Sequence, residues 1–133
     1  ISVAVLSETK SVVCYSYGSG TENPTMACIL NISETEINVA TPFIIEEHIQ
    51  SYINAVPISN SKIIVACSDS NILNQGVVYV LNVSGDTVNI ISKEKLSCSV
   101  SSISLTRLNS SYGYMLVAFN FGNLGVSEVI SIF

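Results

Sequence analysis

The side chains that could carry acid–base or metal chemistry are few and gather around one histidine. His48 is the only histidine in the chain, and it directly follows Glu46 and Glu47. On a strand, Glu46 and His48 would share one face and supply two ligands of a metal site. Zinc usually takes three or four protein ligands, so this pair alone does not complete one. We therefore expect a solvated polar connector here, and we assign no metal, cofactor or catalytic residue.

Two short polar segments resemble pieces of functional loops. Gly18-Ser19-Gly20 lacks both the Gly-x-Ser-x-Gly pattern and the strand-to-helix context of a nucleophile elbow, so we predict an ordinary loop. Asp69-Ser70-Asn71 resembles the start of a calcium loop, but Leu73 occupies the next ligand position. The prediction for this segment is an Asx-turn, in which the aspartate accepts a backbone N–H. A calcium loop assisted by Asn74 is the alternative.

Three disulfide pairings are open to the four cysteines, which are Cys14, Cys28, Cys67 and Cys98. Cys14 and Cys28 are equally far from Thr21, the middle of a loop between two expected strands. A symmetric hairpin would place these two cysteines opposite each other, which makes them the candidate disulfide. The alternative is that each cysteine is a small buried apolar side chain.

Three Asn-x-Ser sequons give candidate N-glycosylation sites at Asn31, Asn82 and Asn109. A chain this rich in Asn and Ser contains about that many by chance, so their number indicates nothing. Asn31 and Asn82 do occupy equivalent places at the ends of two expected strands. They would carry surface glycans if the chain is secreted by a eukaryote.

The composition excludes several classes of protein. Of the 133 residues, 48% are hydrophobic and 11% are charged, whereas disordered chains need low hydrophobicity and high charge. A net charge of −5 argues against a nucleic-acid partner, which would need clustered basic residues. The longest apolar runs, such as 63–67, are far shorter than a membrane-spanning helix requires. Because Ile1 already lies in a strand-like pattern, we expect a chain cut from a longer precursor.

The sequence repeats itself. Residues 1–17 match residues 53–69, at an offset of 52, and a third copy begins at residue 103. The later parts of the copies also match, pairing 29–38 with 80–89 and 76–83 with 125–132. We therefore expect one continuous domain of two full repeats and one truncated repeat, with boundaries at 1–51, 52–102 and 103–133.

Each repeat is typical of short β-strands joined by turns. Strands are predicted at 1–6, 25–32, 63–67 and 77–83, and the unbroken apolar run 63–67 indicates burial on both faces. Polar turns are predicted at Ser7-Glu8-Thr9, at Ser59-Asn60-Ser61 and at Ser84-Gly85-Asp86-Thr87, the last of which leads into a fourth strand. Four strands in one repeat describe a propeller blade, so the expected fold is all-β and propeller-like, with tandem four-stranded antiparallel units.

These residues also resemble a known repeat family. Ile-Ser-Val, Leu-Ser-x-Thr-Lys, Val-Val-x-Tyr and Leu-x-Val-Ser-Gly-x-Thr together resemble the tandem repeat of propeller-like surface and fibre proteins of bacteria, phages and protists. That resemblance covers essentially the whole chain and implies no catalytic residue. A weaker one covers roughly 44–105, where Ile64-Val65-Ala66 and the strand 76–80 are similar to blades of the DNA-damage-binding and polyadenylation-factor scaffold propellers.

The aromatic residues lie on or beside the predicted strands, and packing between blades accounts for most of them. The hairpin that carries Tyr112, Tyr114, Phe119 and Phe121 is a candidate platform for a glycan or protein ligand. The chain contains no Trp, which weakens that interpretation.

Together, these patterns predict a non-enzymatic structural or adhesive subunit of an extracellular or cell-surface assembly. Three units do not close a propeller, and no polar caps are evident, so we expect a homo-oligomer that self-associates through exposed strand edges into a ring or fibril. The alternative is a fragment of a larger propeller that recognises protein or glycan partners, an intracellular scaffold included. Neither hypothesis involves nucleic acid or a membrane span.

Overall fold

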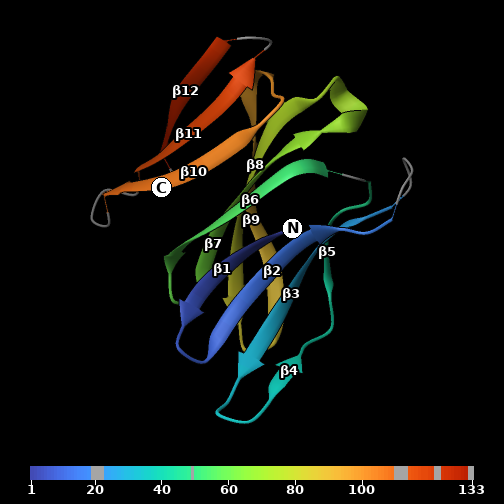
Figure 1. Ribbon diagram of the computed structural model, residues 1–133, viewed down its shortest axis with the longest axis vertical. Coiled ribbons are helices and arrows are strands. Elements are labelled where there is room, and N and C mark those ends of the chain that lie inside the picture. The colour runs from blue at the N-terminus through green and yellow to red at the C-terminus, as the bar shows by residue number, and fades with distance from the viewer. Residues whose placement is uncertain (19–22, 49, 110–113, 122–123, 132–133) are drawn as a thin grey trace.

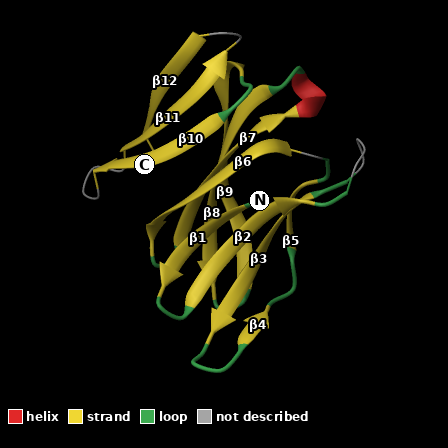
Figure 2. Ribbon diagram, viewed as in Figure 1, coloured by secondary structure: helices red, strands yellow, loops and turns green. Residues whose placement is uncertain are grey.

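The computed structural model describes residues 1–18, 23–48, 50–109, 114–121 and 124–131 (Figure 1). The described residues form twelve β-strands and one three-residue 3₁₀ helix, η1 (Ser70–Ile72) (Figure 2). All strand pairs in these ranges are antiparallel, so the expected all-β antiparallel class is confirmed.

The strands form three sheets, each built from one continuous stretch of chain. Sheet A contains β1 (Ser2–Ser7), β2 (Lys10–Ser16), β3 (Thr25–Ile32), β4 (Ile37–Val39) and β5 (Phe43–Glu46), which pairs with β3. Sheet B contains β6 (Gln50–Ser59), β7 (Lys62–Asp69), β8 (Gln75–Ser84) and β9 (Thr87–Ser99). Sheet C contains β10 (Ile103–Asn109), β11 (Tyr114–Phe121) and β12 (Leu124–Ser131). Five, four and three strands thus follow one another along the chain, and no closed ring of sheets is seen in the described ranges.

The predicted turns are confirmed, and side-chain hydroxyls stabilise two of them. The Thr9 N–H donates to Ser7 Oγ at 3.3 Å, and the Ser61 N–H donates to Ser59 Oγ at 3.2 Å. Gly85 has a φ of +58°, which glycine adopts without steric cost, and it joins β8 to β9. The predicted strands 1–6, 25–32, 63–67 and 77–83 coincide with or lie within observed strands, apart from a one-residue shift of the first.

Two apolar cores hold the three sheets together, and sheet B contributes to both. We call the face of sheet B or C that meets the preceding sheet its front, and the opposite face its back. For sheet A, the back is the face that meets sheet B, and the front is the opposite face. The first core joins the back of sheet A to the front of sheet B, and the second joins the back of sheet B to the front of sheet C. Strand β7 shows the division, because Ile63 lies in the first core and its neighbour Ile64 in the second. Its predicted burial on both faces is therefore confirmed.

The first strand of each sheet lies beside the first strand of the next. Strand β6 contacts β1 on one side and β10 on the other, as the centre of Figure 1 shows. The sheets therefore stack in chain order, with neighbouring sheets related by the same kind of contact. Within the part of the chain that the structure describes, no helix is long and apolar enough to cross a membrane.

Ile63→Ala and Ile64→Ala, made separately, should each lower the free energy of unfolding by about 2–5 kcal/mol, because each opens a cavity in a different core. Equilibrium unfolding in urea measures both. Ile37→Ala is the control, since Ile37 is 62% exposed and its replacement should change stability by less than about 0.5 kcal/mol. A loss in only one of the two core variants would contradict the arrangement of two cores around sheet B.

Candidate functional site

A cluster of ionisable side chains lies at the boundary between sheets A and B. The Glu46 carboxylate, at the end of β5, accepts hydrogen bonds from the Tyr79 hydroxyl at 2.9 Å and from the Lys93 ammonium. The Lys93 nitrogen also lies 5.3 Å from the centre of the Tyr79 ring, within cation–π range. Since Tyr79 and Lys93 belong to β8 and β9, these contacts tie the last strand of sheet A to the last two strands of sheet B.

His48 connects this carboxylate to a second one. Its Nδ1 lies 3.8 Å from Glu46 Oε1, and its Nε2 lies 2.9 Å from Asp69 Oδ1. The Asp69 side chain is buried at the end of β7, and the same Oδ1 accepts the Asn71 N–H at 3.0 Å. That contact is the Asx-turn predicted for this segment, which is therefore confirmed.

Hydroxyl groups of sheet A hold the segment between Glu46 and Gln50 in place. The Gln50 N–H donates to Thr25 Oγ1 at 2.9 Å, while the Thr25 hydroxyl donates to the His48 carbonyl at 3.0 Å. The Ser16 hydroxyl donates to the Gln50 carbonyl at 2.8 Å. This connection from sheet A to sheet B is thus anchored by β2 and β3, and it presents His48 to Asp69.

The surroundings of Glu46 favour its charged form. Burial by itself would raise the pKa of this carboxyl, but the hydrogen bonds from Lys93 and Tyr79 and the charges of Lys93 and His48 outweigh that effect. The net result is a pKa of Glu46 below its usual value. Burial, Cys67 and Glu46 raise the pKa of Tyr79 above its usual value, so its phenol stays neutral and acts as a donor.

The cluster joins sheet A to sheet B. The described residues contain no group of three or more His, Cys, Asp or Glu side chains suited to hold a metal ion. The two ring nitrogens of His48 face different carboxylates.

The connector is less solvated than the sequence led us to expect. The side chains of Glu46 and His48 are each only 19% exposed, because sheet B packs over them. The link from His48 to Asp69, 21 residues later, carries no signal in the sequence.

The candidate disulfide between Cys14 and Cys28 does not match the geometry of the hairpin. Cys14 pairs with Ala27 across β2 and β3, while Cys28 pairs with Val13, so the two cysteines lie on opposite faces of sheet A. The expected symmetric register is wrong by one residue, and such a slip moves a side chain to the other face. All four cysteines are free.

Three of the four thiols are buried. Burial raises the pKa of Cys14 to about 12 and also raises the pKa of Cys28 and of Cys67 above the usual value. These thiols stay protonated at neutral pH and are poor nucleophiles as a result. Cys98 on β9 is only half-buried.

The candidate glycosylation sites lie on strands rather than on loops. Asn31 is on β3, partly exposed, and its amide donates to Asp86 Oδ1 at 2.7 Å, whereas Asn82 is on β8 and donates to Asn89 Oδ1 at 3.4 Å. Asn109 ends β10, and its side chain lies outside the described part of the structure. Whether any of them carries a glycan stays a prediction.

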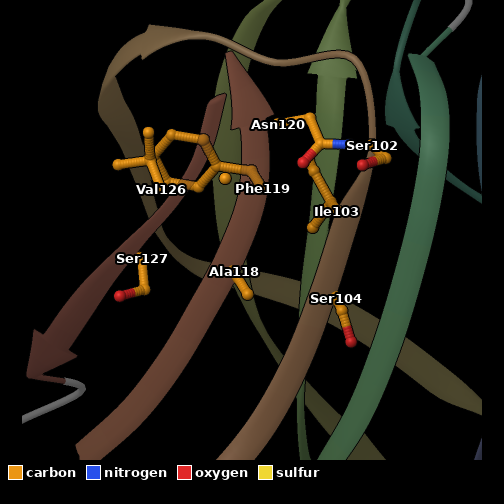
Figure 3. A pocket seen from close by; sticks show the side chains of 9 residues that line it. Ser102, Ile103, Ser104, Ala118, Phe119, Asn120, Val126 and Ser127 are labelled. Atoms are coloured by element: carbon orange, nitrogen blue, oxygen red, sulfur yellow. The ribbon is translucent and has the colours of Figure 1, made fainter. Parts of the chain in front are cut away.

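A hollow of about 520 Å³ lies on sheet C, bordered by two rows of paired residues (Figure 3). One row is Ser104, Ala118 and Ser127, and the other contains Ile103, Phe119 and Val126. Phe119 is only 3% exposed and belongs to the second core, so it cannot serve in the predicted aromatic platform. Of its other members, Tyr112 lies outside the described residues, as do the side chains of Tyr114 and Phe121.

Two sheet faces carry no further sheet within the described ranges, namely the front of sheet A and the back of sheet C. On the front of sheet A, Val3, Val5 and Ile44 are 53%, 60% and 42% exposed, and Val13, Tyr15 and Met26 are half-buried beside them. The back of sheet C presents exposed Ser104, Thr106 and Ser127 together with Val129, which is 57% exposed. Neither set includes a charged side chain.

No protein-family model, curated protein or solved structure matches this chain. Its function therefore has to be inferred from the geometry of the polar cluster, the hollow and the two uncovered faces.

Glu46→Gln should lower stability at neutral pH and flatten its decline in acid. Because the folded state holds the pKa of Glu46 low, the unfolded chain takes up a proton first as the pH falls. The contribution of the Glu46 carboxylate to stability is therefore fully present above the usual pKa of glutamate. It is lost as the pH falls through the pKa that Glu46 has in the folded state. Urea unfolding of the wild type and of Glu46→Gln between about pH 6 and pH 3 measures how steeply the stability of each falls with pH. Glu47→Gln, an exposed neighbour, should keep the wild-type slope, and an unchanged slope in Glu46→Gln would contradict the assignment.

Alkylation should distinguish one thiol from the other three. In the native protein, half-buried Cys98 should react first, while Cys14, Cys28 and Cys67 should react only after unfolding. Mass spectrometry of the denatured protein should count four alkylated cysteines with or without a reductant. A count that rises by two on reduction would show a disulfide, and its mapping to Cys14 and Cys28 would contradict the register of β2 and β3.

Proposed function

We propose that this chain is a non-enzymatic structural subunit that associates with copies of itself to build an extracellular or surface assembly. Its three sheets would act as propeller-like units, each covering a face of the next. The observation that carries this proposal is the pair of uncharged outer faces, together with an open strand edge.

β12 is an open edge, because within the described residues it pairs only with β11. Leu124, Val126 and Val129 on this strand are 68%, 37% and 57% exposed. Glu128 is its single charged residue, and the strand has no proline or lysine of the kind that blocks pairing at an edge. An edge of this length and composition supports strand addition by a second molecule.

The stacking of the sheets supports the propeller-like interpretation. Known propellers close with about four to eight blades around an axis, and their blades are four-stranded sheets that meet face to face. Sheets A, B and C follow one another in that manner, with β1, β6 and β10 side by side. We propose that sheets from other copies of the chain complete the ring.

The chemistry of the polar cluster is in keeping with a structural role. The Tyr79 phenol is kept neutral, and the contacts of Glu46 and His48 tie sheet A to sheet B. An extracellular or surface location is part of the proposal, and Asn31 and Asn82 are partly exposed. The buried thiols are protected from oxidation in such a compartment.

A binding function for glycans or proteins, as part of a larger propeller, is the second candidate. It is favoured by the hollow on sheet C, whose lining includes the polar residues Ser102, Ser104, Asn120 and Ser127. Convergent polar groups in a partly apolar recess are the usual features of a ligand site.

Sedimentation velocity and electron microscopy test the self-association directly. At micromolar concentrations the purified chain should sediment as species larger than 14.2 kDa and form rings or fibrils. Amide hydrogen exchange in β12 should slow as the concentration rises, because its unpaired backbone groups become bonded to a neighbour. A stable, dispersed monomer would contradict the proposal, and saturable glycan binding by that monomer would favour the second candidate.

A further inference from the structure

The contact between sheets A and B follows a simple pattern of residue rows. Ser2, Cys14 and Ala27 pair across the strands to form one row on the back of sheet A. Ala55, Val65 and Tyr79 form the facing row on the front of sheet B. Apart from Ser2, all of these residues belong to the first core. Ser2 adds a polar contact, because its Oγ accepts the Ala55 N–H at 2.9 Å.

The contact between sheets B and C uses equivalent rows. Asn54, Ala66 and Val78 pair across the back of sheet B, while Leu105, Val117 and Glu128 pair across the front of sheet C. Ala66, Val78, Leu105 and Val117 all lie in the second core. In both contacts, a back row with a polar residue on its first strand meets a front row with valine on its second strand.

One front row and one back row remain without a partner sheet in the described structure. The front row of sheet A is Val3, Val13 and Cys28, and it again carries valine on its second strand. The back row of sheet C is Ser104, Ala118 and Ser127, and it again begins with a residue that can accept a hydrogen bond. Ser104 thus corresponds to Ser2, and Val3 corresponds to Ala55.

We propose that the front of sheet A in one copy of this chain packs on the back of sheet C in a second copy, repeating the contact that already joins A to B and B to C. Ser104 Oγ then accepts the N–H of Val3 from the second copy, as Ser2 Oγ accepts that of Ala55 within one copy. This inference rests on the self-association proposed above, and it names the two faces that meet.

We assign a second copy of the chain to these faces because their rows have the features of the rows that meet between sheets A and B and between sheets B and C. Both are uncharged in their central rows, so their contact leaves no buried unpaired charge. Ala118 is small, like Cys14 and Ala66 at the same place in the other back rows, and leaves room for Val13. The back row of sheet C also borders the hollow, around which Figure 3 labels Ser104, Ala118 and Ser127.

The contact is heterologous, since the two faces differ, and each copy therefore takes part in two such contacts, one through each face. Two copies of three sheets each supply six sheets, which is within the range of about four to eight that closes a propeller.

Paired charge substitutions test the contact. Val3→Lys alone and Ser104→Glu alone should each weaken the assembly at least about tenfold in sedimentation equilibrium, because every contact would then bury one unpaired charge. Mixing the two variants should restore assembly. In an alternating arrangement, half of the contacts join two unsubstituted faces, and the other half pair the introduced lysine with the introduced glutamate. Thr9→Lys, in the exposed turn after β1, is the control and should assemble as the wild type does.

The outcomes separate this inference from the function on which it rests. Val3 is 53% exposed in the single chain, so Val3→Lys should keep the wild-type circular dichroism and melting temperature. Unchanged assembly in both single variants would overturn the proposed contact and leave self-association standing. A mixture that fails to assemble would overturn the pairing of these two faces. A wild-type chain that stays monomeric would overturn both the contact and the self-association.

Discussion

The burial of both faces of sheet B is the constraint on which the rest of the structure depends. A strand such as β7, in which every residue from Ile63 to Asp69 is buried, is stable only if another layer covers each side of its sheet. Sheets A and C provide those layers, and they do so with rows of small and β-branched side chains. Sheets A and C each have a second face as well, and an apolar face of this kind is also stabilised when another layer covers it.

Polar contacts complement the apolar cores at their margins. Around Glu46, the chain changes from sheet A to sheet B, and the carboxylates of Glu46 and Asp69 are held there by Lys93, Tyr79 and His48. Buried charges are tolerated when they are paired and hydrogen-bonded, and their directionality favours one relative placement of the two sheets. The apolar cores supply most of the attraction between sheets, whereas this cluster helps to set their orientation.

Much of the local structure could be predicted because it depends on neighbouring residues. The alternation of apolar and polar residues marks the strands, and Gly85 with its flanking polar residues marks a turn that needs a positive φ. The register of β2 against β3 could not be predicted, because the length of the loop between them is compatible with two registers that differ by one residue. That one residue separates a cross-strand cysteine pair from two thiols on opposite faces.

The sequence by itself determined that this chain forms antiparallel strands, where its turns lie and that its middle strand is buried on both sides, since these follow from side-chain periodicity and turn chemistry. Only the tertiary structure decided which side chains meet across the sheets. His48 reaches Asp69 and Glu46 reaches Lys93 because separate strands bring them together, and no spacing in the sequence encodes that distance. The tertiary structure also decided which faces remain uncovered, because a residue such as Val3 is exposed or buried according to whether another sheet lies on it.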